Sequence, residues 1–239
     1  MDKIFEHPFL GPIIIRKRTG LRRLSIRIDQ KKRVILTIPY AVATSEGLAF
    51  LDRKSDWVKK SLDTVTQKIE KKTLFTPETS FRTKWHELIL IPEQRARIAV
   101  SLTAESLIIR FPQTVDILQD EFQDFVRTAV EKTLTLEAKA IMPSLVQEVA
   151  AETNLHFKNI SIRKTKSRWG SCTVQNNLNF SSYLMLLPDH LIRYVIIHEL
   201  CHTIHKNHGP KFWQLLDKLT DGKAKTLAKE MKNHTTRFF

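Results

Sequence analysis

The feature that most constrains this chain is a short apolar segment that ends in a cluster of histidines. Residues 194–202 read Tyr-Val-Ile-Ile-His-Glu-Leu-Cys-His, which places His198, Glu199 and His202 directly after an apolar run. Residues four apart in an α-helix point to nearly the same side, so the spacing predicts a helix with both imidazoles on one face. Two neutral imidazoles on one helical face form half of a tetrahedral zinc site. Glu199 projects beside that face, where it can hold a metal-bound water instead of ligating the metal.

His208 is the expected third ligand. Four of the nine histidines fall within residues 198–208. We expect the helix to end at Lys206-Asn207, because asparagine tolerates the left-handed conformation that terminates helices. The chain would then turn back and bring His208 to the metal, with Asp217 or Asp221 in the next helix as alternative ligands. Three protein ligands leave the fourth position open for water, which is typical of a catalytic zinc site.

Composition limits where such a site can operate. The chain has 239 residues, 42% of them apolar, and only six glycines, which indicates a folded protein with a sizeable core. It contains no apolar run near eighteen residues and no signal peptide at its start, so we expect a cytoplasmic protein without a membrane segment. In that reducing compartment Cys172 and Cys201 are expected to be thiols. The net charge of +14 favours anionic partners.

Strand patterns dominate the first half of the chain. Leu24, Ile26 and Ile28 alternate with polar residues, and a second strand follows at 34–38. Further strands are predicted at 81–91, 97–102 and 107–111, and a helical insertion begins at Thr44. The first hairpin is strongly basic, and it is interpreted either as a solvated edge or as an anion-facing surface. Its basic residues are Arg16, Lys17, Arg18, Arg22, Arg23 and Arg27. We therefore predict an antiparallel, β-rich, basic N-terminal region over residues 1–115.

Helical periodicity takes over in residues 116–239. A long apolar repeat runs to Met142, where Pro143 is predicted to end or kink the helix, and a further helix follows from Ser144 to Ala151. A short β-hairpin over residues 166–180 then precedes the histidine helix, which is expected to begin near Pro188-Asp189. The predicted fold class is α+β, with the β-rich region followed by a mostly helical domain that carries the metal site.

Three motifs give the sequence a family resemblance. They are Ser167-Arg-Trp-Gly-Ser-Cys172, the helix from Tyr194 to His202, and His208-Gly-Pro-Lys-Phe-Trp213. Together they resemble the YgjP-like metallopeptidase family, which is related to the WLM and SprT-type zinc proteins. The resemblance covers almost the whole chain and is sharp over residues 163–213.

The resemblance implies a zincin-like domain in residues 116–239. Zinc would be held at the positions matching His198, His202 and His208, and Glu199 matches the catalytic glutamate. His205 stands where the metzincins have a turn glycine, so their turn geometry is not carried over. Family membership does not define a substrate.

The leading hypothesis is a zinc-dependent hydrolase that acts on peptide bonds. Glu199 would act as general base toward a metal-activated water and return the proton to the leaving amine. Arg168, His205 and Tyr194 are candidates for stabilising the oxyanion. Arg168-Trp169-Gly170 also has a structural interpretation, in which the tryptophan packs on the metal helix and the glycine permits a tight turn.

Two alternatives use the positive charge. A metal-dependent phosphohydrolase would act on a nucleotide or another phosphate-bearing substrate. A nucleic-acid-associated protease would bind nucleic acid through the basic half and cleave bound protein. An all-histidine site is less typical of phosphoryl chemistry than a carboxylate-rich magnesium site, which places the peptidase first. The oligomeric state is not fixed by the sequence.

Overall fold

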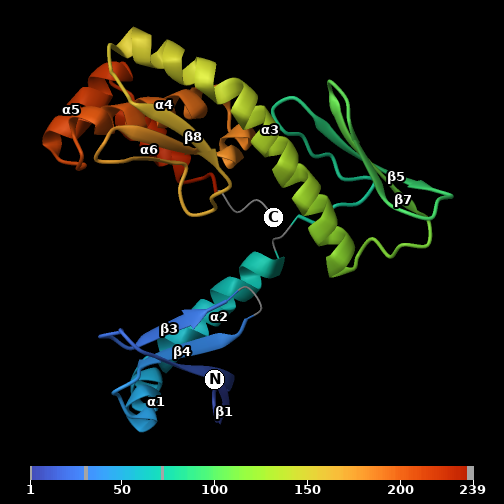
Figure 1. The fold of residues 1–239 in the computed structure, drawn as a ribbon, viewed down its shortest axis with the longest axis vertical. Coiled ribbons are helices and arrows are strands. Elements are labelled where there is room, and N and C mark those ends of the chain that lie inside the picture. The colour runs from blue at the N-terminus through green and yellow to red at the C-terminus, as the bar shows by residue number, and fades with distance from the viewer. Residues whose placement is uncertain (1, 30–31, 71–72, 236–239) are drawn as a thin grey trace. The chain divides into compact units, whose positions relative to one another are not determined.

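The computed structural model describes residues 2–29, 32–70 and 73–235. It divides into two compact units, residues 1–72 and 73–239, here called the N-terminal and C-terminal units and described separately (Figure 1). The sequence division at residue 115 follows the change from strands to helices. The division by spatial contacts comes earlier, so the sheet formed by residues 87–112 lies with the helices that follow it.

The N-terminal unit is a four-stranded sheet in the order β1-β2-β4-β3 with two helices. Its core consists of alternate strand residues and residues of both helices, including Ile13, Leu36 and Leu51, which are fully buried. Gly47 lies so close to Ile38 that an added Cβ would stand 2.4 Å from the Ile38 Cδ1 atom, which lets the first helix approach the sheet. The elements are β1 (Lys3–His7), β2 (Gly11–Arg18), β3 (Ser25–Ile28), β4 (Val34–Pro39), α1 (Thr44–Arg53) and α2 (Ser55–Glu70).

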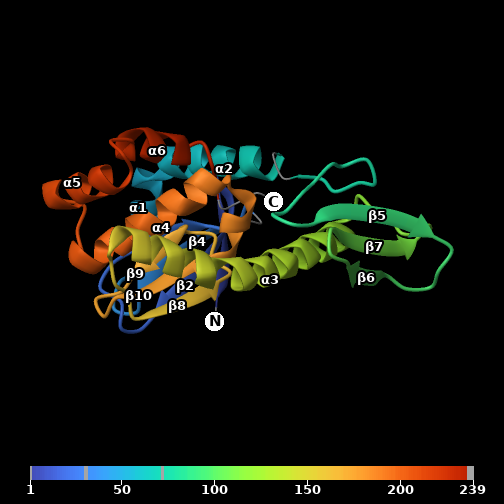
Figure 2. The same cartoon turned by 90° about the horizontal axis from the view of Figure 1, so that it is seen from above.

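The C-terminal unit is built around one long helix, α3 (Asp120–Thr153). Figures 1 and 2 show α3 extending from the sheet that contains β5 and β7 to α4 and β8. Buried residues from both sheets and from the helices form a single core cluster with it. The remaining elements are β5 (Glu87–Glu93), β6 (Ala99–Leu102), β7 (Ser106–Pro112), β8 (Asn159–Arg163), β9 (Gly170–Cys172), β10 (Asn177–Ser181), a 3₁₀ turn (Ser182–Leu186), α4 (Asp189–Ile204), α5 (Pro210–Leu219) and α6 (Ala224–Met231).

All three sheets are mixed, so the predicted antiparallel arrangement is wrong in part. Each sheet contains three strands that follow one another in the sequence: β2, β3 and β4; β5, β6 and β7; or β8, β9 and β10. In each set the first strand pairs in parallel with the third, and the second strand pairs antiparallel with the third. The expected hairpins exist as β3–β4 and β9–β10. An alternation of apolar and polar residues predicts that a segment is a strand, but it does not predict which strand pairs with it. The parallel pairs here join strands that are not consecutive in the sequence. The α+β class itself is confirmed.

Pro143 does not end its helix, which corrects the prediction of two helices. α3 continues through Pro143 to Thr153 and ends at Asn154 in the left-handed conformation. Met142 and Val146 on either side of the proline are fully buried. Burial of these neighbours offsets the backbone hydrogen bond that proline cannot donate.

No helix in the described part of the chain is long and apolar enough to cross a membrane. The cytoplasmic location stays a prediction.

Candidate metal centre

The histidines are positioned by α4, which begins after Pro188 as expected. Leu191, Val195 and Leu200 are among the many buried residues of this helix, so it lies deep in the core of the C-terminal unit. A helix that is apolar on most sides is fixed by packing all around it. His198 and His202 are half-buried near the end of the helix, where the apolar run gives way to polar residues.

His198, His202 and His208 form the histidine triad. One ring nitrogen from each lies within 4.8 Å of the others, and the Nε2 atoms of His198 and His208 are 3.0 Å apart. The fully buried Phe212 of α5 packs against all three rings, with centroid distances of 5.0, 4.5 and 4.7 Å to His198, His202 and His208. Phe212 is therefore a core residue that supports the triad.

His208 reaches the triad by a route that differs from the predicted one. α4 ends at Ile204, and His205 follows in an extended conformation, so the helix ends earlier and without a left-handed Asn207. The His205 carbonyl lies 2.9 Å from Nδ1 of His202, a contact that fixes the ring with Nε2 toward the triad. Lys206 bonds to the Thr173 carbonyl at 3.0 Å and to the Asn176 side chain, which ties this connection to the β9–β10 turn.

The surroundings favour the neutral form of His198 and His202. Burial, followed by the neighbouring His202 and His208, lowers the pKa of His198 from 6.5 to about 3. Burial also lowers the pKa of His202, against the hydrogen bond to the His205 carbonyl. Neutral imidazole is the form that ligates metals.

These residues fit a transition-metal ion. Tetrahedral bonds of about 2.1 Å place zinc ligands about 3.4 Å apart, which is within the spread of the triad nitrogens. The three imidazoles come from one helix and the turn after it. The His205 carbonyl contacts Nδ1 of His202, the kind of hydrogen bond that usually orients a metal-ligating histidine. The triad can therefore hold a metal ion.

Glu199 is buried beside the triad, with 6% of its surface exposed. Its Oε2 atom has no hydrogen-bond partner within the described structure. Burial raises the pKa of Glu199 to about 7, and the Arg168 guanidinium acts in the opposite direction. A carboxyl with a pKa near neutrality and an unused oxygen is suited to take up and release a proton.

Gly170 makes room for this carboxylate. A Cβ atom at residue 170 would lie 2.7 Å from both Cγ and Oε1 of Glu199. Gly170 begins strand β9 and does not have a positive φ, so the interpretation as a tight turn is wrong. Glycine is required at position 170 because strand β9 passes close to the Glu199 side chain. The sequence Trp169-Gly170 does not indicate which side chain packs against the glycine.

The other predicted residues fall into two groups. Tyr194 is buried one turn before His198, with ring centroids 6.0 Å apart, and Arg168 is exposed but within electrostatic reach of Glu199. Asp217 instead accepts a hydrogen bond from the Ala224 backbone, and neither it nor Asp221 joins the triad among the described residues. His208, and neither of these aspartates, is therefore the third residue of the cluster with His198 and His202.

The two cysteines are free thiols and stand outside the triad. Cys201 is fully buried, and burial raises its pKa to about 12. Cys172 ends β9, and burial raises its pKa as well. Both groups are therefore held in the thiol form, which agrees with the sequence prediction.

Comparison with known proteins gives the family of this chain. Residues 22–234 match the family described as YgjP-like, metallopeptidase domain. No curated protein matches the chain. Among solved structures it is similar to the metallopeptidase zymogen jannalysin of Methanocaldococcus jannaschii, with 25% identity and a TM-score of 0.34 over 38% of this chain and 93% of that one. It is also similar to the zymogen abylysin of Pyrococcus abyssi, with 19% identity and a TM-score of 0.35 over 39% of this chain and 94% of that one. Because the family match spans most of the sequence, this chain belongs to the YgjP-like metallopeptidase-domain family.

Proposed function

We propose that this protein is a zinc-dependent metallopeptidase in which His198, His202 and His208 hold the ion and Glu199 is the general base. One observation carries the proposal: a buried carboxylate with an unpaired oxygen lies beside three imidazoles that converge on one point. Burying an unpaired carboxylate oxygen removes its hydration and destabilises the folded protein, so such an arrangement indicates a function.

The protein groups account for the proton transfers. A zinc ion in the triad supplies a Lewis acid that lowers the pKa of water from 15.7 toward about 7. Oε2 of Glu199 accepts the proton of the attacking water and then donates it to the leaving amine. The positive charge of Arg168 counters the effect of burial on the pKa of Glu199, so a substantial fraction of the base is ionised at neutral pH. Arg168 and Tyr194 remain our candidates for stabilising the oxyanion.

The phosphohydrolase alternative is less well supported. Among the described residues, the cluster of side chains that could hold a metal ion is the triad, and it consists of imidazoles alone. Phosphoryl transfer is served more often by carboxylate-rich sites that hold magnesium.

The general base is tested by Glu199→Gln. Glutamine has nearly the shape of glutamate but cannot act as a base at this position. We expect kcat to fall by roughly 10²–10⁴-fold on a peptide that the wild-type protein cleaves, with zinc content unchanged. The measurements are cleavage of a peptide library followed by mass spectrometry, and metal content by elemental analysis. Near wild-type turnover by a zinc-loaded variant would remove Glu199 from the mechanism.

The ligand set is tested by His208→Ala, with His156→Ala as the matched control. His156 is another exposed histidine and lies outside the triad. We expect about one zinc per chain in the wild type and in the control, and a sharply reduced zinc content in His208→Ala. Full occupancy in His208→Ala would exclude His208 as a ligand.

A further inference from the structure

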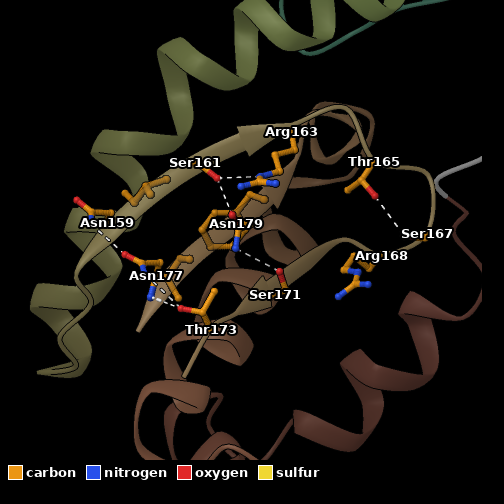
Figure 3. A pocket seen from close by; sticks show the side chains of 13 residues that line it. Asn159, Ser161, Arg163, Thr165, Ser167, Arg168, Ser171, Thr173, Asn177 and Asn179 are labelled. Carbon is orange, nitrogen blue, oxygen red and sulfur yellow. Dashed lines mark hydrogen bonds between the residues drawn. The ribbon is translucent and has the colours of Figure 1, made fainter. Parts of the chain in front are cut away.

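The sheet beside the metal centre has a cavity on its other face. The cavity has a volume of about 630 Å³ and lies over β8, β10 and β9 (Figure 3). Gly170 faces Glu199, so its neighbour Ser171 points to the opposite side of β9, where it lines the cavity. β9 is an outer strand of the sheet, and it carries both Gly170, which lies against Glu199, and Ser171, which lines the cavity.

One wall of the cavity is an extended segment in which polar residues alternate with residues that face the protein. Ile160 and Ile162 pack against the core, and Lys164 and Lys166 form ion pairs with Glu131 of α3. Ile160 also borders the cavity, and the polar residues that line it are Asn159, Ser161, Arg163, Thr165 and Ser167.

Glu131 holds this wall in place beyond the end of β8. Its side chain is 9% exposed and accepts hydrogen bonds from Lys164, Lys166 and the Tyr183 hydroxyl. Burial alone would raise the pKa of Glu131, but these donors outweigh burial and keep the pKa below 4.5. Glu131 therefore stays ionised at neutral pH, and the segment that carries Thr165 and Ser167 is fixed before any ligand arrives.

The cavity is cationic at one end. Arg163 and Arg168 line it, and no aspartate or glutamate does. Arg163 donates to the Ser161 hydroxyl at 3.3 Å, and neither guanidinium forms an ion pair found within the described structure. Figure 3 shows Arg163, Thr165, Ser167 and Arg168 on the same side of the cavity. Guanidinium groups at this end of the cavity suit an anionic group of the ligand.

The rest of the floor is neutral and polar. Asn159 donates to Asn177 at 3.0 Å, and Ser161 donates to Asn179 at 2.6 Å, which gives two rows of amides and hydroxyls across the strands. Each side-chain amide has further donors and lone pairs for a ligand. Rows that repeat every second residue match the repeat of an extended peptide.

This distribution disfavours a nucleic acid. A bound single strand needs cations along its length and aromatic faces on which bases stack. Here both cations lie at one end, and Phe180, the aromatic residue that lines the cavity, is fully buried beneath it.

We propose that this cavity binds an extended peptide segment that carries one carboxylate, with Arg163 and Arg168 as the cationic groups that attract this carboxylate to the cavity. The ligand is identified as a substrate segment on the strength of the proposed peptidase function. Arg168 is also within electrostatic reach of Glu199, so one of the two cations of the cavity also influences the metal centre. The cavity thus selects peptides that carry an acidic residue.

Binding tests this separately from catalysis. The full chain with Glu199→Gln is titrated into two fluorescein-labelled octapeptide pools, which differ only in a fixed Glu or Gln at position four. We expect the Glu pool to bind five- to tenfold more tightly by fluorescence anisotropy, with the preference reduced at high salt. Arg163→Gln should abolish the preference. The control Arg97→Gln removes the same charge from an exposed arginine between β5 and β6 and should retain the preference.

Several results would overturn the inference. Equal binding of the two pools would do so, as would equal effects of Arg163→Gln and Arg97→Gln when circular dichroism shows both variants folded. Tighter binding of a labelled oligo(dT) octamer, lost in Arg163→Gln, would assign the cavity to nucleic acid instead. Because none of these readouts requires cleavage, a preference for the Glu pool supports the cavity site even if the Glu199→Gln kinetic test fails.

Discussion

At the scale of single residues, the missing side chain of residue 170 decides how Glu199 is placed. In Gly170→Ala the new Cβ would lie 2.7 Å from two atoms of Glu199, well inside normal contact distance. The glutamate must move, and displacement of a catalytic group by about an ångström costs roughly 10²-fold in rate. We expect kcat to fall by about that factor while the triad still binds zinc, as measured by peptide cleavage and elemental analysis.

Gly209→Ala is the matched control for this substitution. Gly209 is next to His208, has a φ of −75°, and a Cβ there would meet no atom within 4 Å. It should keep most of its activity. Equal losses in the two variants would show that close approach of β9 to Glu199 is not the cause.

The buried carboxylate of Glu199 also predicts how stability depends on pH. Its pKa is raised from 4.5 to about 7 by burial, so folding binds a proton. The stabilisation is fully present below pH 4.5 and is lost as the pH rises through about 7, and a rise of this size corresponds to about 3 kcal/mol. We therefore expect metal-free Glu199→Gln to be more stable than metal-free wild type at pH 8, and nearly equal at pH 4.5. Urea unfolding of both proteins at the two pH values measures this, and an equal difference at both would contradict it.

At the scale of elements, α3 shows how packing overrides a local signal. Pro143 is exposed and cannot donate a backbone hydrogen bond, yet the helix continues because buried residues flank it. In Pro143→Ala the lost bond can form and no buried contact is removed. We expect the free energy of unfolding to rise by about 1–3 kcal/mol.

The exposed Gln147, one turn further along α3, gives a control for this change. Gln147→Ala should alter stability by less than about 0.5 kcal/mol. Unfolding in urea distinguishes the two variants. No gain in Pro143→Ala would mean that the helix is already adapted to the proline.

At the scale of the whole molecule, the metal centre and its support belong to the C-terminal unit. The triad, Glu199 and the core cluster all lie within residues 73–239. We expect a fragment of residues 73–239 to fold and bind one zinc ion. A fragment of residues 116–239 lacks Leu90, Ile109 and Phe111, which are buried in the same core, and should aggregate or unfold. Circular dichroism and zinc content report the outcome, and a stable, zinc-binding 116–239 fragment would support the boundary suggested by the sequence.

Features that depend on local spacing could be predicted from the amino-acid sequence. The four-residue interval between His198 and His202 placed both rings on one helical face, and the motifs around Arg168 and His208 identified the family. Alternating apolar residues marked most of the strands, since a strand turns successive side chains to opposite faces.

Features that depend on contacts between residues far apart in the sequence became known from the folded structure. It paired strands in parallel, carried α3 through Pro143, and set Gly170 against Glu199. The His205 backbone carbonyl orients the His202 ring. Because every residue has a backbone carbonyl, the residue type at position 205 could not predict this role. Periodicity reports which face of an element is buried. Which partner buries it is fixed by packing of the whole chain, because the free energy of burial depends on the area covered and not on which element covers it.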